Sequence, residues 1–504
     1  MTRADLAFDL VPSRHPSLRV SVAVARSVPD DATAIGVPVA SDGEVPRERL
    51  DVDRATLQAS GFSAGVGETL VLPRSDGPTV IEIGVGPRAE LAVTAMRNAA
   101  AAFARAAIHH TRIAIDLTGV ATQLEARVAG QAVVEGVLMA RYQYRAFADK
   151  APDEHLAVLT LVTVGNRARA MAAGAAAGEV TARAVNTARD LCNDPATHLT
   201  ARRYADVARA IGAETGLEVE VFDEKQLAKL GCGGLLGVNA GSDEPARMIK
   251  LVYQPAGRAR GNMHLVGKGI MYDSGGISLK PSDAMHAAMK LDMSGSAAIL
   301  GAMSTLRDLG CRTAVTGWLM CTDNMPSGTA TRLGDVLTTH SGKTIEVINA
   351  DAEGRLVMAD GIDMAVDESP DAIVTIATLT GAALRTFGSA MAAMLANRGE
   401  LADQLYAAGT ATDEPVWELP LIRRYRSQID SAIADIKNMG GENAGTITAA
   451  LFLEDFTAGI PFGHLDICGP MMTATDDSWR STGATAFGTR LLAEFARNFR
   501  RPTS

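Results

Sequence analysis

The 504-residue sequence has few of the residues and segments that would indicate export, membrane insertion or a disulfide framework. It contains five cysteines at scattered positions without a CxxC pair, which is typical of free thiols in a reducing compartment. It has neither an N-terminal apolar segment of signal-peptide type nor an apolar run long enough to span a bilayer. We therefore expect a cytoplasmic protein without a membrane partner.

Several motifs of other hydrolases are also missing. The sequence has no H-E-x-x-H pair and no Cys/His cluster, which argues against a zincin, and no G-x-S-x-G elbow of a serine hydrolase. His464 and Cys468 are expected to be core residues near the last strand. The net charge of -10 and the pI near 5.5 argue against a nucleic-acid partner.

Aromatic residues make up only 4% of the chain, whereas 47% is hydrophobic and alanine is abundant. This composition predicts closely packed helices and a large core. Segments of strand type alternate with helical ones, which indicates an α/β fold. We predict a small N-terminal α/β domain at residues 1–165 and a connecting helix at 166–190. A larger C-terminal α/β domain at 191–504 would contain a central mixed, mostly parallel sheet.

Residues 84–89, Gly-Val-Gly-Pro-Arg-Ala, follow a predicted strand and read G-x-G-x-x-A. This pattern resembles a dinucleotide-binding fingerprint. The alternative is a tight turn with Pro87 at the first position of a helix. The acidic residue that would contact the ribose, Asp116, comes later than the roughly 20 residues expected, which favours the turn.

Residues 349–356, Asn-Ala-Asp-Ala-Glu-Gly-Arg-Leu, place Asp351, Glu353 and Arg355 at alternate positions. In an extended segment these side chains would lie on one side. An apolar run of strand type, residues 345–348, precedes the motif and a helical segment follows, so the motif lies where a strand leads into a helix. Two neighbouring carboxylates repel each other unless a positive charge lies between them. Arginine could supply that charge, but a metal ion is the stronger candidate.

Two other segments add carboxylates and lysines. Lys268, Asp273 and Lys280 lie among the closely spaced glycines of residues 266–281, and Asp292 precedes an alanine-rich helix. Four carboxylates suit hard or borderline ions such as Mg, Mn and Zn and would neutralise two of them. The alternatives are surface ion pairs, a structural salt-bridge network, or a phosphate-binding loop that lacks the usual Lys-Ser/Thr ending.

Together these segments resemble the leucyl aminopeptidase (cytosol aminopeptidase) family, of the bacterial aminopeptidase A type. Further matching segments follow in order along most of the larger domain: residues 325–336, 341–344, 378–382, 441–452 and 464–467. The sequence departs from the family pattern in three places. Alanine replaces the usual threonine at position 350, and serines occupy positions 294 and 296. The spacer between Lys280 and Asp292 is one residue longer than usual.

The resemblance implies a metal-dependent aminopeptidase that removes leucine and other apolar N-terminal residues from peptides. It implies two divalent ions per subunit, Mn²⁺ or Zn²⁺, a metal-bridging hydroxide as the nucleophile, and a homo-hexamer. The implied metal ligands are Lys268, Asp273, Asp292, Asp351 and Glu353, with Asp273 and Glu353 bridging the two ions.

The resemblance also implies roles for residues beside the metals. Lys280 would stabilise the developing oxyanion, and Arg355 would hold a bicarbonate ion that acts as general base. Met289, Thr378 and Gly381 would line the pocket for the first side chain.

Two other functions are compatible with the sequence. One is a non-catalytic binding or scaffold member of the family, and the other is a metal hydrolase with a different amide substrate. The intact set of ligands, lysine and arginine favours the peptidase, because a purely structural descendant has no physical reason to retain it.

Overall fold

The computed structural model describes residues 8–43, 45, 52–119, 124–147 and 155–503. The described chain forms two compact units. The smaller unit contains Val11–Thr187 and Thr473–Gly483, and the larger unit contains the remaining described residues. None of the helices in these ranges combines the length and apolar character needed to cross a bilayer.

The smaller unit is built on a six-stranded sheet with the order β1-β6-β5-β2-β4-β3. All neighbouring strands are parallel except β3 and β4. The strands are β1 Ser21–Ala25, β2 Ala34–Val39, β3 Thr69–Leu72, β4 Thr79–Gly84, β5 Arg112–Asp116 and β6 Val158–Val162. The helices are α1 Arg54–Ala59, α2 Val93–Ala106 and α3 Ala126–Ala140, and α4 Ala168–Asn193 leads into the larger unit.

The glycine-rich turn after β4 does not begin a helix, so the prediction of a helix starting at Pro87 was wrong. Pro87 has extended backbone (φ -65°, ψ 140°), a short 3-10 turn follows, and α2 begins only at Val93. A Cβ at Gly84 would lie 2.0 Å from the carbonyl oxygen of Gly65, and Gly86 has φ +72°. The glycines therefore permit a close backbone approach and a left-handed turn, which favours the turn over the dinucleotide interpretation.

The larger unit contains an eight-stranded mixed sheet with the order β15-β14-β17-β13-β9-β10-β8-β7. Its four central strands, β17, β13, β9 and β10, are mutually parallel, as predicted for the mostly parallel sheet. The strands are β7 Glu218–Phe222, β8 Arg247–Tyr253, β9 Asn262–Asp273, β10 Ala314–Asn324, β13 Ala372–Ala377, β14 Ala392–Ala396, β15 Val416–Glu418 and β17 Phe462–Asp466.

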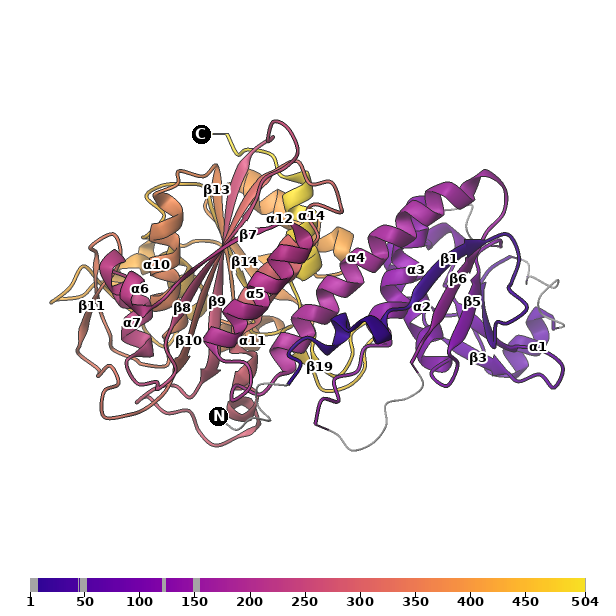
Figure 1. The fold of residues 1–504 in the computed structure, drawn as a ribbon, viewed down its shortest axis with the longest axis horizontal. Coiled ribbons are helices and arrows are strands. Elements are labelled where there is room, and N and C mark those ends of the chain that lie inside the picture. The colour runs from indigo at the N-terminus through magenta and orange to yellow at the C-terminus, as the bar shows by residue number, and fades with distance from the viewer. Residues whose placement is uncertain (1–7, 44, 46–51, 120–123, 148–154, 504) are drawn as a thin grey trace. The chain divides into compact units, whose positions relative to one another are not determined.

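Helices cover both faces of this sheet (Figure 1). Val266 of β9 packs with Leu356 in the core under one group of helices. On the opposite face, a Cβ at Gly267 would lie 2.8 Å from the Ile299 side chain. The first group is α6 Glu224–Leu230, α7 Gly233–Asn239, α10 Gly354–Val366 and α13 Gly445–Glu454; the second is α5 Ala201–Thr215, α9 Ser294–Ser304, α12 Gly399–Thr412 and α14 Thr489–Asn498.

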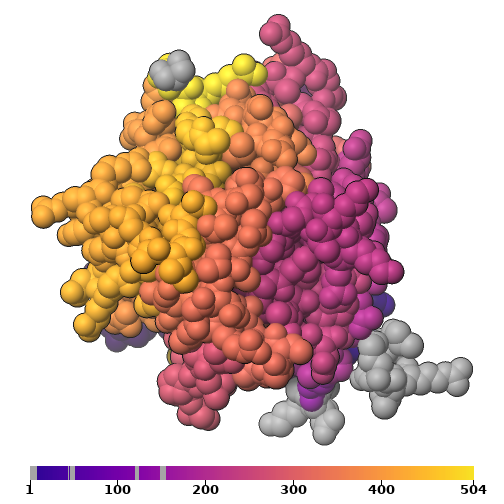
Figure 2. Space-filling view, turned by 90° about the vertical axis from the view of Figure 1, so that its left-hand side faces the viewer, coloured from indigo at the N-terminus to yellow at the C-terminus, as the bar shows by residue number. Residues whose placement is uncertain are grey.

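A three-stranded sheet lies apart from the central one and contains β11 Val336–Thr338, β12 Thr344–Glu346 and β16 Ile436–Lys437. Residues 345–346, the first half of the apolar run before the carboxylate motif, belong to β12. The strand that precedes the motif is therefore part of this small sheet and not of the central one. Figure 2 shows this side of the larger unit, where magenta, salmon and orange segments far apart in the sequence are adjacent. The pairing of β12 with β16 accounts for part of that adjacency.

Candidate metal centre

The central parallel strands of the larger unit end in polar residues at one edge of the sheet. β9 ends at Asp273, β10 at Asn324 and β17 at Asp466, and Thr378 directly follows β13. Because the carboxyl ends of parallel strands meet at the same edge, these side chains are brought together although they are far apart in the sequence.

Lys268 lies within β9, so this part of the glycine-rich run is a strand and not the phosphate-binding loop considered from the sequence. A Cβ at Gly267 would lie 2.8 Å from the Cα of Ser296, and one at Gly269 would lie 2.8 Å from the carbonyl oxygen of Met320. The glycines therefore serve close packing of the strand against its neighbours.

Three buried carboxylates converge beside this lysine. One oxygen each of Asp273, Asp292 and Glu353 lies within 4.8 Å of the others, and the three residues are 2%, 3% and 1% exposed. Lys268 Nζ lies 2.8 Å from Asp292 Oδ2 and 2.7 Å from Glu353 Oε1. It also donates to the carbonyl oxygen of Thr378 at 2.9 Å.

The second lysine connects Asp351 to this group. Lys280 Nζ lies 2.8 Å from Asp273 Oδ2 and 2.6 Å from Asp351 Oδ1. The side chain of Asp351 is 34% exposed, in contrast to the three buried carboxylates. All five candidate ligands and Lys280 therefore belong to one connected group of charges.

The segment that carries the motif is not extended, and the alternate spacing therefore does not align its side chains as in a strand. Asp351 lies in a turn, and Glu353 already has helical dihedral angles (φ -78°, ψ -36°) before α10 begins. The next residue is Gly354, and this position has no room for a side chain, because a Cβ there would lie 2.6 Å from Lys268 Cδ. Arg355 lies in the first turn of α10 and is buried.

Burial dominates the electrostatics of the group. Burial, reinforced by neighbouring carboxylates, raises the pKa values of Asp292, Asp351 and Glu353 above their ordinary range. Burial also favours the neutral amine of Lys268, but Asp292 and Glu353 outweigh that effect and raise its pKa. Burial lowers the pKa of Arg355 to about 10.

The donor set fits divalent cations. Four carboxylates face two lysines and Arg355, so negative charge is in excess. Glu353 Oε2 is buried and accepts no hydrogen bond from the described residues. From the same residues, Asp292 Oδ2 and Asp351 Oδ1 accept none of good geometry although each lies near a lysine. Oxygen ligands with one amine suit Mn and Zn among the borderline ions.

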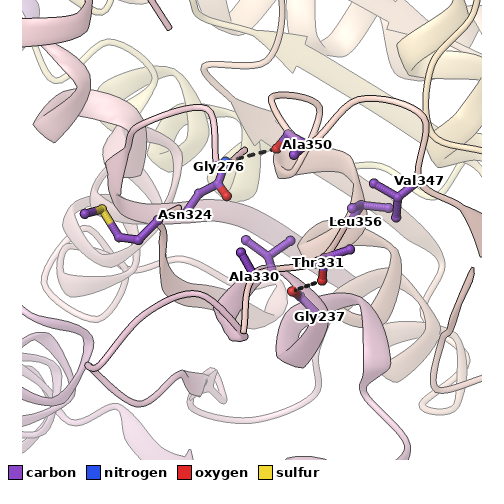
Figure 3. Close-up of a pocket in the computed structure, with 10 residues that line it drawn as sticks. Gly237, Gly276, Asn324, Ala330, Thr331, Val347, Ala350 and Leu356 are labelled. Atoms are coloured by element: carbon purple, nitrogen blue, oxygen red, sulfur yellow. Dashed lines mark hydrogen bonds between the residues drawn. The ribbon is translucent and has the colours of Figure 1, made fainter. Parts of the chain in front are cut away.

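Asn324 is a supporting residue that the sequence analysis missed. Its Nδ2 donates to Asp273 Oδ1 at 2.8 Å and to the carbonyl oxygen of Ala350 at 3.0 Å. Figure 3 shows the second contact, with Ala350 on the wall of a small cavity under the motif. Asn324 thus joins a candidate ligand to the loop that carries Asp351. A polar residue at the end of an apolar strand was the available sequence signal.

Thr378 and Asp466 also support the group. Thr378 Oγ1 donates to Asp292 Oδ1 at 2.7 Å, so its hydroxyl contacts a candidate ligand. Asp466 is fully buried and accepts hydrogen bonds from the amides of Leu379 and Thr380 and from the Thr380 hydroxyl. This carboxylate therefore fixes the loop that follows β13.

The departures from the family pattern leave Asp292 in the group. The longer spacer contains a short helix, α8 Ala284–Ala287, before the 3-10 turn with Asp292. The hydroxyls of Ser294 and Ser296 donate to the carbonyl oxygens of Leu291 (2.5 Å) and Met293 (2.8 Å). Both serines therefore support the turn that carries Asp292.

The charged group borders an open cavity of about 370 Å³. Met289, Thr378 and Gly381 line it together with Lys280 and most of the charged group. Cys468 also lines it and is only half-buried, so the prediction that this residue is in the core was wrong. His464 is fully buried in β17, as predicted, with Nδ1 2.8 Å from Thr375 Oγ1.

Comparison with known proteins gives matches to both parts of the chain. A family profile described as "Cytosol aminopeptidase family, catalytic domain" matches residues 186–493, and the corresponding N-terminal domain profile matches residues 54–151. A probable cytosol aminopeptidase of Streptomyces avermitilis is 39% identical over 509 residues, covering 95% of this chain and 98% of that protein. One from Chlorobaculum tepidum is 44% identical over 378 residues, covering 73% and 75%.

Among solved structures, the bottromycin maturation enzyme BotP in complex with Mn is similar to this chain. Its TM-score is 0.82 at 35% sequence identity, and the match covers 92% of this chain and 99% of that one. The similarity therefore includes both compact units and not only the sheet that carries the charged group.

Proposed function

Since this chain belongs to the cytosol aminopeptidase family, a family of metallo-aminopeptidases, we propose that it removes leucine and other apolar residues from peptide N-termini. The observation that carries the proposal is the buried group of Asp273, Asp292 and Glu353 around Lys268, beside an open cavity. A scaffold protein would gain nothing from burying these charges together, because burial of charge costs free energy.

We propose that Lys268, Asp273, Asp292, Asp351 and Glu353 hold two divalent ions, Mn²⁺ or Zn²⁺. Asp292 and Glu353 keep Lys268 a cation, and it would bind as the neutral amine because two adjacent dications would lower its pKa. When bound, the ions would supply Lewis acidity and lower the pKa of a coordinated water. The Mn in the BotP complex supports manganese as one candidate.

Two residues of the cavity wall suit the chemistry next to these ligands. Lys280 is 18% exposed, and Asp273 and Asp351 raise its pKa although burial opposes this. It therefore remains a cation that can donate a hydrogen bond to an oxyanion. Arg355 lines the cavity, and within the described part of the chain its buried Nε has no hydrogen-bond partner. Its planar fork suits bicarbonate, which would accept a proton from the attacking water.

The first side chain of the substrate would enter the part of the cavity formed by Met289, Thr378 and Gly381. Leu379 and Met471 also line this cavity, and this apolar surface supports a preference for leucine and similar residues.

We also propose that the protein is a homo-hexamer and that it is located in the cytoplasm. The five cysteines are free thiols, which supports a reducing compartment. Light scattering after gel filtration would measure the number of subunits.

The test is hydrolysis of leucyl amide by the purified protein. We expect turnover with Mn²⁺ or Zn²⁺, loss on chelation, and recovery when metal is restored. Metal binding without release of leucine would favour the scaffold. Inactivity on leucyl amide together with metal-dependent hydrolysis of another amide would favour the third alternative.

A further inference from the structure

The cavity wall carries a second arginine, Arg385, which is not part of the charged group. It lies in α11 (Gly381–Phe387), four residues after Gly381. Among the described lining residues, Arg385 and Glu442 are the charged side chains outside the metal centre and its two flanking cations. Arg385 therefore adds a positive charge to the α11 side of the wall, where its neighbours Gly381 and Leu384 are uncharged.

The side chain of Arg385 extends back along α11 towards the cavity. Its Nη1 lies 3.4 Å from the position that a Cβ on Gly381 would occupy, and its Cζ lies at 3.9 Å. The guanidinium thus lies over a residue that lines the cavity. The comparable guanidinium of Arg423 instead forms an ion pair with Glu454.

Within the described ranges, Arg385 has no hydrogen-bond or ion-pair partner, and its side chain is exposed. An exposed arginine is often simply solvated. Arg385 differs from such residues in its location, because it lies over Gly381. Gly381 is three residues from Thr378, which contacts both Lys268 and Asp292. The guanidinium therefore lies close to the loop that borders the candidate metal centre.

We propose that, between substrates that are otherwise equal, Arg385 makes the cavity favour the one that carries a carboxylate near the scissile bond. The carboxylate would be either the acidic side chain of the first residue or the C-terminal carboxylate of a dipeptide. The planar fork of arginine matches a carboxylate and can donate two hydrogen bonds to it. Glu442 opposes this preference in sign, but among the described residues the three atoms nearest to a Cβ at Gly381 all belong to Arg385. The inference rests on the proposed aminopeptidase function.

The experiment compares substrate pairs that differ only in one charge. One pair is glutamyl amide and glutaminyl amide, and the other is leucylglycine and leucylglycinamide. In the unsubstituted protein we expect kcat/KM to be about tenfold higher for the charged member of one pair, mainly through KM. Arg385→Gln should reduce this ratio to near one, and Arg385→Lys should retain part of it, because lysine keeps the charge without the fork.

Arg424→Gln is the matched control, since it removes an exposed arginine that does not line the cavity. The pair that responds identifies the source of the carboxylate. A kcat/KM ratio near one for both pairs in the unsubstituted protein would overturn the inference. An unchanged ratio in Arg385→Gln, or an equal loss of the ratio in Arg424→Gln, would also overturn it. If the proposed aminopeptidase function is wrong, the result differs from failure of this inference, because none of these substrates would be hydrolysed. In that case calorimetric binding of the same pairs to metal-loaded protein, with and without Arg385, decides the question.

Discussion

At the scale of single residues, the two lysines of the charged group differ in exposure and partners. Lys268 is buried between Asp292 and Glu353, whereas Lys280 contacts Asp273 and Asp351 and is partly open to the cavity. A buried lysine between two candidate ligands is placed to complete a metal site. A partly exposed one is placed to meet a substrate, so different substitutions should separate metal binding from turnover.

Glu353→Ala should abolish leucyl amide turnover and lower the metal content, because it removes a carboxylate from the three-acid set. Lys280→Ala should reduce kcat by roughly 100-fold to 1000-fold, the usual effect of losing an oxyanion donor, with metal content near normal. Elemental analysis alongside kinetics measures both.

Lys225→Ala, an exposed lysine of α6, is the matched control for Lys280→Ala. Full activity of Glu353→Ala would exclude a ligand role. Parallel loss of metal and turnover in Lys280→Ala would show that this lysine supports the site and not the transition state.

Burial of Glu82, in β4 of the smaller unit, should lower the stability of the folded protein when its carboxyl group is ionised. It is fully buried, and neither carboxylate oxygen has a hydrogen-bond partner among the residues that the structure describes. Burial raises its pKa from 4.5 to about 7. Between these two pH values the unfolded chain is ionised while the folded chain holds the proton. The free energy of unfolding should therefore fall as pH rises from 4.5 to 7, by about 3 kcal/mol at most.

Glu82→Gln should consequently stabilise the smaller unit at pH 8 and leave its stability nearly unchanged at pH 4.5. Denaturant unfolding at the two pH values measures the difference. Glu90→Gln, at an exposed position, serves as control and should show no such pH dependence. Equal effects of Glu82→Gln at both pH values would mean that the carboxyl is not destabilised by burial.

At the scale of elements, the short strand β16 holds the motif loop. Asn438 of the loop that follows β16 is fully buried and accepts a hydrogen bond from the Ile348 amide at 2.9 Å. It donates to the carbonyl oxygens of Asn349 (2.7 Å) and Ala352 (3.3 Å). One amide side chain thus fixes both ends of the turn that carries Asp351.

Asn438→Ala should weaken Mn²⁺ binding by about 10-fold to 100-fold, the usual effect of removing a group that orients ligands. It should also lower the free energy of unfolding by about 1–3 kcal/mol, because buried backbone groups lose their partner. Titration calorimetry and denaturant unfolding measure the two effects. Asn443→Ala, at an exposed nearby position, is the control, and unchanged Mn²⁺ affinity in Asn438→Ala would refute the positioning role.

At the scale of the whole molecule, all candidate ligands belong to one compact unit. The smaller unit takes Thr473–Gly483 from late in the sequence. Within that unit, Arg105 donates to the carbonyl oxygens of Ser478 (2.9 Å) and Arg480 (2.9 Å). Because the candidate ligands all belong to the larger unit, we expect metal binding to stabilise that unit and not the smaller one.

Mn²⁺ should slow hydrogen exchange in peptides of the larger unit that cover residues 262–293 and 344–366, and not in those that cover β4 and α2. Binding to the folded state alone adds about 2.7 kcal/mol of stability when free metal is 100 times Kd. Mass-spectrometric exchange with and without Mn²⁺ measures this, and Glu353→Ala should remove the effect. Equal protection of both units would contradict a site confined to one of them.

The fold class and the residues of the charged group follow from the sequence alone. The alternation of strands and helices predicted two α/β parts with a mostly parallel sheet, which the structure confirms. The acidic and basic residues of the motifs indicated a metal site, because hard cations need oxygen ligands whatever the fold. Chemistry of this kind depends on residue type, which the sequence shows directly.

How those residues meet depends on long-range contacts in the folded chain. Asp351 and Glu353 are placed by a turn and a helix start, and not by the extended segment that their spacing suggested. Asn324, Asn438 and Asp466 act through partners 26 to 90 residues away in the sequence, so no local pattern reveals them. Pairing between distant strands fixes such contacts, and local spacing constrains only neighbouring residues.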